Sequence, residues 1–376
     1  MVCLLALMAG CMPRVTPSSS RYAYVTNEKD NNLLVVDLNT EKVIKTLPTG
    51  RIPHALVFTP AGKGYVNNRG EHSLTVIDGN NLTVLKKIPL PATSMQIALS
   101  PDGKTLAVGY KDALLITLID TATDRILGSV PIGRDKNSKK PIRIMHPFWS
   151  KDGRFVYAGD NLNKTVVKID AARQKITATI PLKATVHHFI TAPDGTIYIC
   201  EVRDNRGRLG VAVLDGTTDR IIKRIKIPMP PGETARGHHG KFTPDGKFFY
   251  FCNEGGRTLA IIDTATLQLV KTIQVGKGAG HTYFSRDGKR AFIVCHHDNI
   301  VSVIDTASQR LIKNVSVGTG KKEGHSGYIG DDGSFYMLNA ADGMICRING
   351  RTLALQSRIK VGRNPMIMVV RILPRR

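Results

Sequence analysis

Residues Gly50–Gly62 read GRIPHALVFTPAG, and this stretch decides the fold of the whole chain. It places a basic residue before a histidine, continues into an apolar run and ends in a turn that closes on glycine. The same plan recurs, often with SPDG, TPDG or SRDG as the turn. The closing glycines lie 41 to 51 residues apart: Gly62, Gly103, Gly153, Gly195, Gly246, Gly288 and Gly333. Such a period is typical of repeat architectures.

Each period contains four short strand signals. The first precedes the turn, as in Ala55–Thr59, and the other three follow it, as in Phe248–Cys252, Leu259–Asp263 and Leu269–Val275. Each run is β-branched or aromatic and is bounded by turn residues, which indicates a strand. Four antiparallel strands in 40–50 residues make one blade of a β-propeller, so the sequence predicts an all-β propeller.

The number of blades follows from the residue that ends each third strand. Eight such positions occur: Asp37, Asp78, Asp120, Asp170, Asp215, Asp263, Asp305 and Asn349. The chain begins with three strands, Tyr22–Thr26, Leu33–Asp37 and Val43–Leu47, and ends with one, Met366–Ile372. We therefore predict eight blades, the first of them closed by pairing of the two ends of the chain, which removes two open sheet edges. Seven blades is the alternative.

The N-terminal residues differ from the repeats. Residues 1–20 are predicted to be a signal segment and tether, and residues 21–376 the propeller. Leu7–Cys11 resembles the cleavage site of bacterial lipoproteins, which predicts lipidation of Cys11, a lipid anchor in the membrane and a periplasmic location. The basic start expected of a signal peptide is missing.

The net charge of +23 has two sources. Many lysines fall on the fourth, outermost strands, where lysine blocks pairing between sheet edges. A nucleic-acid partner is not expected, because basic and aromatic residues do not interleave. The cysteines that end second strands, Cys200, Cys252 and Cys295, are expected to be free thiols, because equivalent positions of neighbouring blades lie beyond disulfide reach.

The remaining charge lies in the loops that lead into the inner strands. Seven of the eight loops are basic, with Arg51, Arg134, Lys136, Lys139, Lys140, Arg143, Lys183, Arg236, Lys277, Lys321, Lys322 and Arg363. These loops share one face of a propeller, so a basic ring around the channel is predicted to attract anions.

Histidines coincide with this ring, at the start of the inner strands. Eight residues before the turn glycine lie His54, His187, His238 and His325, and seven residues before it lie His146, His188, His239 and His281. Side chains alternate across a strand, so one register is expected to face the channel and the other a neighbouring blade. Structural histidines that hydrogen-bond across blades are one interpretation, and a metal centre or a haem is the other. His296 and His297 are expected to belong to loop structure.

Tyr22–Asn27 (YAYVTN), with the repeated IDTAT and SPDG elements, resembles the YVTN-type bacterial β-propellers. More narrowly, the eight blades, the lipoprotein-like start and His54 within PHALVFTPAG resemble the haem-d1 propellers. These include the d1 domain of cytochrome cd1 nitrite reductase and the NirF-like maturation lipoproteins. The stretch from Pro91 to Tyr110 is also similar to the next blade of that family. A c-type haem attachment site is missing, so a complete nitrite reductase is not expected.

The resemblance implies that the channel binds an anionic tetrapyrrole of haem-d1 type, with an oxidoreductase activity in haem-d1 maturation. His54 matches the axial ligand. Arg51, Arg143, Arg236 and Arg363 are the candidate partners of the carboxylates, and His281 and His325 the candidate catalytic proton donors or distal ligands.

Two alternatives remain open. One is a non-enzymatic module whose basic face docks an acidic protein such as a cytochrome. The other is a copper site at the hub, with His54, His187, His238 and His325 as ligands, because imidazole suits copper.

Overall fold

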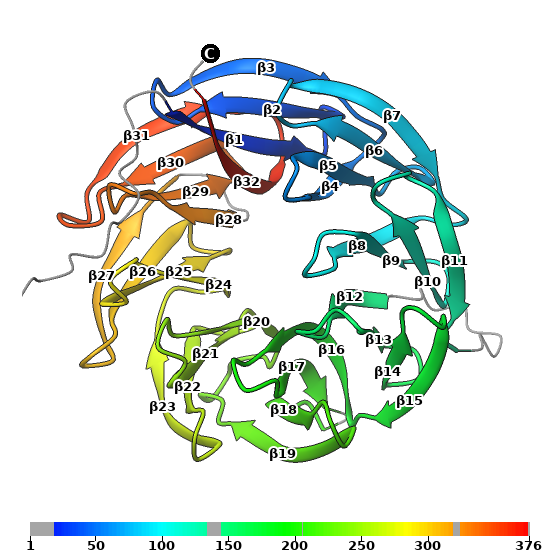
Figure 1. Cartoon of the computed structure of the whole chain (residues 1–376). Helices are drawn as coiled ribbons and strands as arrows, with labels where there is room; N and C mark the ends of the chain where they lie inside the picture. Colours follow the sequence, from blue (N-terminus) through cyan, green and yellow to red (C-terminus); the bar gives the residue numbers. More distant parts are fainter. Residues whose placement is uncertain (1–18, 134–143, 205, 319–323, 375–376) are drawn as a thin grey trace, which may run out of the picture.

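The computed structural model describes residues 19–133, 144–204, 206–318 and 324–374, apart from the side chains of Ile144, Met145 and His325. In these ranges all regular secondary structure is β-strand. The 32 strands form eight antiparallel sheets of four strands, arranged as a ring of blades around a central channel (Figure 1). No helix capable of crossing a membrane occurs in the described part of the chain. The prediction of an eight-bladed propeller is confirmed, and the seven-bladed alternative is wrong.

The blades follow one another in sequence order, each from its inner to its outer strand. Blade 1 comprises β32 (Pro365–Pro374), β1 (Ser19–Asn27), β2 (Asn32–Asp37) and β3 (Lys42–Pro48), and blade 2 comprises β4 (Pro53–Phe58), β5 (Lys63–Asn68), β6 (Ser73–Asp78) and β7 (Thr83–Pro89). Blade 3 comprises β8 (Ser94–Leu99), β9 (Thr105–Tyr110), β10 (Leu115–Asp120) and β11 (Ile126–Pro131), and blade 4 comprises β12 (Ile144–Trp149), β13 (Phe155–Asp160), β14 (Thr165–Asp170) and β15 (Lys175–Pro181).

Blades 5 to 8 repeat this order. Blade 5 comprises β16 (Ala184–Thr191), β17 (Ile197–Asp204), β18 (Leu209–Asp215) and β19 (Arg220–Ile227), and blade 6 comprises β20 (Gly237–Phe242), β21 (Phe248–Asn253), β22 (Thr258–Asp263) and β23 (Gln268–Gln274). Blade 7 comprises β24 (Ala279–Phe284), β25 (Arg290–Cys295), β26 (Ile300–Asp305) and β27 (Arg310–Ser316), and blade 8 comprises β28 (Gly324–Ile329), β29 (Phe335–Asn339), β30 (Met344–Ile348) and β31 (Leu355–Lys360).

Blade 1 is closed by the two ends of the chain, as predicted. β32 is its inner strand and pairs antiparallel with β1, with Tyr24 opposite Val369 and Ser20 opposite Leu373. In Figure 1 the dark red strand lies beside the dark blue one. The pairing extends to Ser19, so the first strand begins two residues before position 21. The ring therefore closes through backbone hydrogen bonds between residues that are more than 300 positions apart in the sequence.

The core lies between the blades. Each of eight hydrophobic clusters joins buried side chains of two neighbouring blades. Buried tyrosines also link blades through their hydroxyls: Tyr65 donates to the carbonyl of Thr121 at 3.1 Å, and Tyr157 to that of Gly216 at 3.4 Å. No blade buries its apolar faces alone, so stability depends on the complete ring.

The outer strands are exposed and lysine-rich, as predicted for sheet edges. In β7, Lys86 pairs with Asp124 at 2.7 Å and Lys87 with Glu71 at 2.9 Å. The four cysteines among the described residues, Cys200, Cys252, Cys295 and Cys346, are buried free thiols, which confirms that prediction for Cys200, Cys252 and Cys295.

The inner strands form a closed ring around the channel, each one contacting the inner strands on both sides. All eight are irregular near their first residues, where the register with the paired second strand of the blade shifts: β4, β8, β12, β16, β20, β24, β28 and β32. A bulge of this kind bends the strand and redirects a side chain. These irregularities lie at the end of the channel where the inner strands begin, which we call the channel mouth.

Candidate metal centre at the channel mouth

A polar cavity of about 310 Å³ occupies the channel mouth. Its walls come from the first residues of inner strands and from the loops that follow second strands, in blades 1 to 7. Seven histidines line it: His54, His146, His187, His238, His239, His281 and His296. The sequence predicted that histidines converge at the mouth, and this is confirmed for six of them: His54, His146, His187, His238, His239 and His281.

The imidazoles from blades 4 to 7 form one compact group. The ring centroids of His187 and His238 lie 4.0 Å apart, and those of His239 and His281 lie 4.3 Å apart. His146 lies 5.4 Å from His239 and 5.6 Å from His187. The rings thus contact one another from four successive inner strands. We call His146, His187, His188, His238, His239, His281 and His296 the histidine cluster.

Both registers of the inner strands contribute to this group, which corrects the expectation that only one would face the channel. His187 and His238 come from one register, and His239 and His281 from the other, yet all four line the cavity. The register shifts within β16, β20 and β24 explain this, because a bulge breaks the strict alternation of side chains. His146 also has a left-handed backbone, with a φ of 38°.

One histidine has the cross-blade role of a structural histidine. Nδ1 of His238 donates a hydrogen bond to the carbonyl of Gly280 in the next blade at 3.0 Å. Because a carbonyl only accepts, Nδ1 carries the proton, and Nε2 holds the lone pair of the neutral ring. Such a bond is also the one that orients metal-binding imidazoles in other proteins. For His238 the structural and metal-binding interpretations are therefore compatible.

Four imidazoles of the cluster are held in their neutral form. Burial, reinforced by the neighbouring imidazoles, lowers the pKa of His146 and His239 well below the usual range. Burial also lowers the pKa of His187 to about 4 and that of His188 to about 3. Neutral imidazole is the form that binds metal ions, so these four side chains present lone pairs at neutral pH without first losing protons.

Three groups of side chains place their ligand atoms within 4.8 Å of one another. They are His146 with His187 and His239, then His238 with His239 and His281, and finally His238 with Glu254 and His296. Of the histidines predicted as copper ligands, His187 and His238 belong to these groups, whereas His54 lies outside them. The side chain of His325 lies outside the described residues.

Sequence reasoning missed Glu254 and assigned His296 to loop structure. The structure corrects this: both side chains line the cavity, and both are buried. Nδ1 of His296 lies 3.7 Å from Oε1 of Glu254. Burial opposes ionisation of Glu254, but His296 and Arg236 together hold its pKa below the usual value. A buried carboxylate thus lies beside the imidazoles.

His54 lies within a separate set of contacts. Its side chain is 4% exposed, and Nδ1 donates to Oε1 of Glu28 at 2.8 Å. Burial, followed by the charge of Arg69, holds the pKa of His54 well below its usual range. The predicted axial ligand is therefore a buried, neutral and oriented imidazole, supported by the kind of carboxylate contact seen behind ligating histidines.

Of the four arginines predicted to bind carboxylates, only Arg236 lines the cavity among the described residues. Arg236 lines it and pairs with Glu254, Nε to Oε2, at 3.1 Å. Arg51 and Arg363 are exposed beside it and do not line it, and Arg363 pairs with Asp30 at 2.5 Å. Arg69, which sequence reasoning did not select, does line the cavity. Arg143 lies outside the described residues, as does Cys11.

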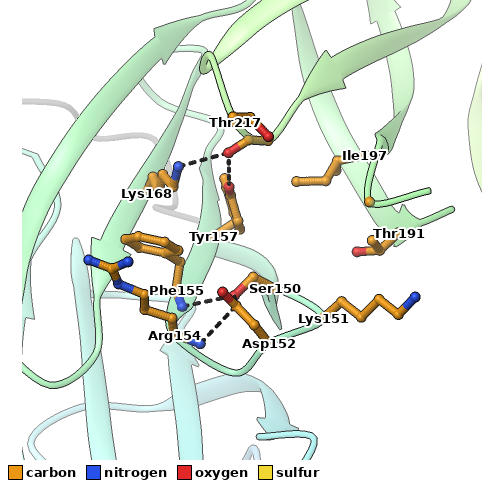
Figure 2. A pocket seen from close by; sticks show the side chains of 12 residues that line it. Ser150, Lys151, Asp152, Arg154, Phe155, Tyr157, Lys168, Thr191, Ile197 and Thr217 are labelled. Atoms are coloured by element: carbon orange, nitrogen blue, oxygen red, sulfur yellow. Dashed lines mark hydrogen bonds between the residues drawn. The ribbon is translucent and has the colours of Figure 1, made fainter. Parts of the chain in front are cut away.

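A larger groove of about 680 Å³ lies between blades 4 and 5, beside the glycine turns (Figure 2). Its polar groups mainly bond to one another: Lys168 donates to the carbonyl of Gly216 at 2.9 Å and to Asp219 at 2.8 Å. Asp152 accepts from the amide of Arg154 at 3.1 Å. Lys63 makes the same contact with Asp124 between blades 2 and 3, so the groove belongs to the repeated joint between blades.

Comparison with known proteins supports the fold. No family model matches the chain, and no curated protein does. Among solved structures, it is similar to dihydro-haem-d1 dehydrogenase NirN in complex with DHE, with a TM-score of 0.77 and 17% identity over 93% of this chain and 74% of that chain. This chain shares its β-propeller fold with NirN. The resemblance inferred from the sequence is thereby confirmed at the level of fold.

Two further structures are similar. Hydrazine synthase of Kuenenia stuttgartiensis matches with a TM-score of 0.58 and 21% identity, over 76% of this chain and 92% of that chain. Apo AztD from Citrobacter koseri matches with a TM-score of 0.66 and 11% identity, over 94% of this chain and 98% of that chain. At these identities the likeness establishes architecture alone, so the function has to be argued from the cavity.

The lowered pKa values predict acid sensitivity of the metal-free protein. His187 and His188 are neutral when folded down to about pH 4 and 3 but take up protons near pH 6.5 when unfolded. Between these values the unfolded state binds more protons, so the free energy of unfolding decreases as the pH falls below about 6.5. Urea denaturation at pH 7, 6, 5 and 4 measures this slope. A His187→Gln/His188→Gln variant should show a shallower slope, and an identical slope would contradict the assignment.

Proposed function

We propose that this protein binds a first-row transition-metal ion in the histidine cluster. The observation that supports this most is the presence of three overlapping groups of ligands, each with its atoms within 4.8 Å. Imidazole binds zinc, copper, iron and nickel well. Because the affinities of most sites follow the same Irving–Williams order, the geometry of the site and the availability of each metal decide which ion is bound. Copper, predicted from the sequence, is one member of this class, and no feature of the cluster selects it over the others.

The environment of the cluster favours a metal ion over a purely structural role. Packing buried neutral imidazoles against one another leaves many polar atoms to satisfy. Such atoms lower the stability of the metal-free protein, whereas a coordinated cation satisfies several lone pairs at once. Binding would also stabilise the fold through mass action.

The experiment is a titration of the metal-free protein with Co²⁺, followed by its visible spectrum and by equilibrium dialysis. The expected result is saturable uptake, with the absorption bands of Co²⁺ held by nitrogen ligands. Zn²⁺ should then bleach these bands by displacement, and Cu²⁺ is tested in parallel. Retention of no metal after dialysis would contradict the proposed function.

Tetrapyrrole binding is the second candidate, and the fold shared with the NirN–DHE complex favours it. The oriented imidazole of His54 also suits an axial ligand, and Arg69 and Arg236 offer guanidinium groups to carboxylates. Space argues against it. A cavity of about 310 Å³ lies at the lower end of the roughly 300–1,000 Å³ that holds drug-sized ligands, and a tetrapyrrole is larger than most of these. The histidine cluster would have to spread apart.

Haem d1 added to the purified protein distinguishes the two candidates. If the macrocycle binds with His54 as its axial ligand, the Soret band shifts in the wild type, and His54→Ala abolishes this shift. Glu28→Gln, which keeps a hydrogen-bonding group beside Nδ1, should reduce affinity by roughly 10-fold to 100-fold. His72→Ala, which removes an exposed imidazole outside the cavity, serves as the control. An unchanged spectrum of the wild type excludes this candidate.

A further inference from the structure

The charge of the cavity determines what else a metal-loaded cluster can bind. An imidazole that binds a metal ion adds no charge, and the one carboxylate in the ligand groups, Glu254, is already paired with Arg236 at 3.1 Å. Arg69 adds a second guanidinium group to the wall. A divalent cation placed among these buried and half-buried groups would leave an excess of positive charge where charges interact more strongly than in bulk water.

The coordination of the ion points in the same direction. Each group in the cluster supplies three ligand atoms, and a first-row ion with three protein ligands keeps at least one position open to an exogenous ligand. The cavity also exceeds the size of an ion. Its volume of about 310 Å³ corresponds to roughly ten water molecules at about 30 Å³ each. Space for a small molecule beside the metal is therefore available.

We propose that the metal-loaded cavity binds a small anion, an oxyanion or a carboxylate, as the open ligand of the metal and that Arg69 holds it. This inference rests on the proposed metal binding. The anion replaces water at the open position, and its charge offsets that of the ion. Arg69 enters from the loop after β5, in blade 2, across the channel from the cluster in blades 4 to 7.

The surface around the mouth is suited to delivering an anion. Four exposed basic side chains surround it from different blades: Arg51, Lys183, Lys277 and Arg363. Each precedes an inner strand, which places it at the same end of the channel as the cavity. Arg363 is paired with Asp30, so the excess positive charge comes from Arg51, Lys183 and Lys277. Such an excess raises the local concentration of anions and their rate of association. The rim thus brings anions to the mouth, and Arg69 binds them inside.

Arg69 is the side chain on which the test depends. Its Nε and Nη2 atoms donate to the carbonyl of Met95 at 3.1 and 3.0 Å, which fixes the guanidinium group against blade 3. Gln at this position retains a donor for that carbonyl and removes the charge. Arg351 is the control, because it is an exposed arginine in the turn between β30 and β31, at the end of the channel opposite the mouth, and does not line the cavity.

The experiment titrates the Co²⁺-loaded protein with sodium azide and then with sodium acetate, at constant ionic strength. The expected result is a saturable change of the visible spectrum. Arg69→Gln should raise the anion dissociation constant about tenfold or more without changing the Co²⁺ stoichiometry. Arg69→Lys should have a dissociation constant between those of the wild type and Arg69→Gln, and Arg351→Gln should have the same dissociation constant as the wild type.

The outcomes separate this inference from the function on which it rests. If no Co²⁺ is taken up, the proposed function fails before any anion is added. If Co²⁺ binds and neither anion changes the spectrum, metal binding stands and the anion proposal is wrong. If the anions bind equally well to wild type and Arg69→Gln, or if Arg351→Gln weakens binding as much as Arg69→Gln, the assignment to Arg69 is overturned.

Discussion

A chain that lacks residues 362–376 is expected to aggregate or to remain unfolded. The deletion removes β32, the inner strand of blade 1, which pairs with β1 and also contacts β4 and β28. The buried side chains of Met368 and Leu373 disappear from the two clusters that join blade 1 to blades 2 and 8. β1 is left as an apolar open edge, which invites pairing with other chains. Size-exclusion chromatography and circular dichroism measure the result.

The matched control removes the residues that precede the first strand. Deletion of residues 12–18 leaves β1 intact from Ser19, so the melting temperature should not change. The two deletions differ in whether the ladder that closes the ring is lost. A monomeric chain without residues 362–376 that melts cooperatively near the wild-type temperature would show that closure of blade 1 contributes little to stability.

Replacing His238 and His239 together with alanine is expected to abolish metal binding. Each of the three ligand groups contains at least one of these two residues, so the double variant breaks all of them. Loss of an outer partner of a metal ligand typically costs 10-fold to 100-fold in affinity, and removing ligands should exceed the upper value. Equilibrium dialysis with Co²⁺ measures the change.

Two further measurements make this result interpretable. His72→Ala removes an exposed imidazole outside the cluster and should bind Co²⁺ like the wild type. The double variant also loses the bond from His238 to Gly280, which costs about 1 kcal/mol of stability, so its melting curve has to confirm that it is folded. A folded double variant with unchanged affinity would place the metal elsewhere.

The architecture could be predicted from the sequence because it repeats. The spacing of the turn glycines sets the length of one blade, and the Asp or Asn that ends each third strand counts the blades. Closure followed from counting the strands left over at the two ends, and the pairing of Tyr24 with Val369 confirms it. These conclusions needed only local strand signals and the requirement that sheet edges be covered.

The composition of the cavity was less predictable, because bulges and neighbouring blades decide it. Strict alternation of side chains predicts that only one of two consecutive residues faces the channel. The register shift between Gly237 and Gly240 instead lets both His238 and His239 line the cavity. His296 and Glu254 follow second strands, and their approach to the cluster depends on packing between blades 6 and 7. One signal was present: a side chain at Gly280 would collide with the ring of His296, so the absence of a side chain there leaves room for it.

X-ray absorption spectroscopy at the metal edge of the loaded protein tests the central claim most directly. The account predicts nitrogen neighbours at roughly 2.0–2.1 Å from the metal, with the multiple scattering of at least two imidazole rings. His238→Ala/His239→Ala should lose this pattern. A first shell dominated by sulfur at roughly 2.3 Å, or one made of water oxygens without imidazole scattering, would contradict the assignment of the metal to the histidine cluster.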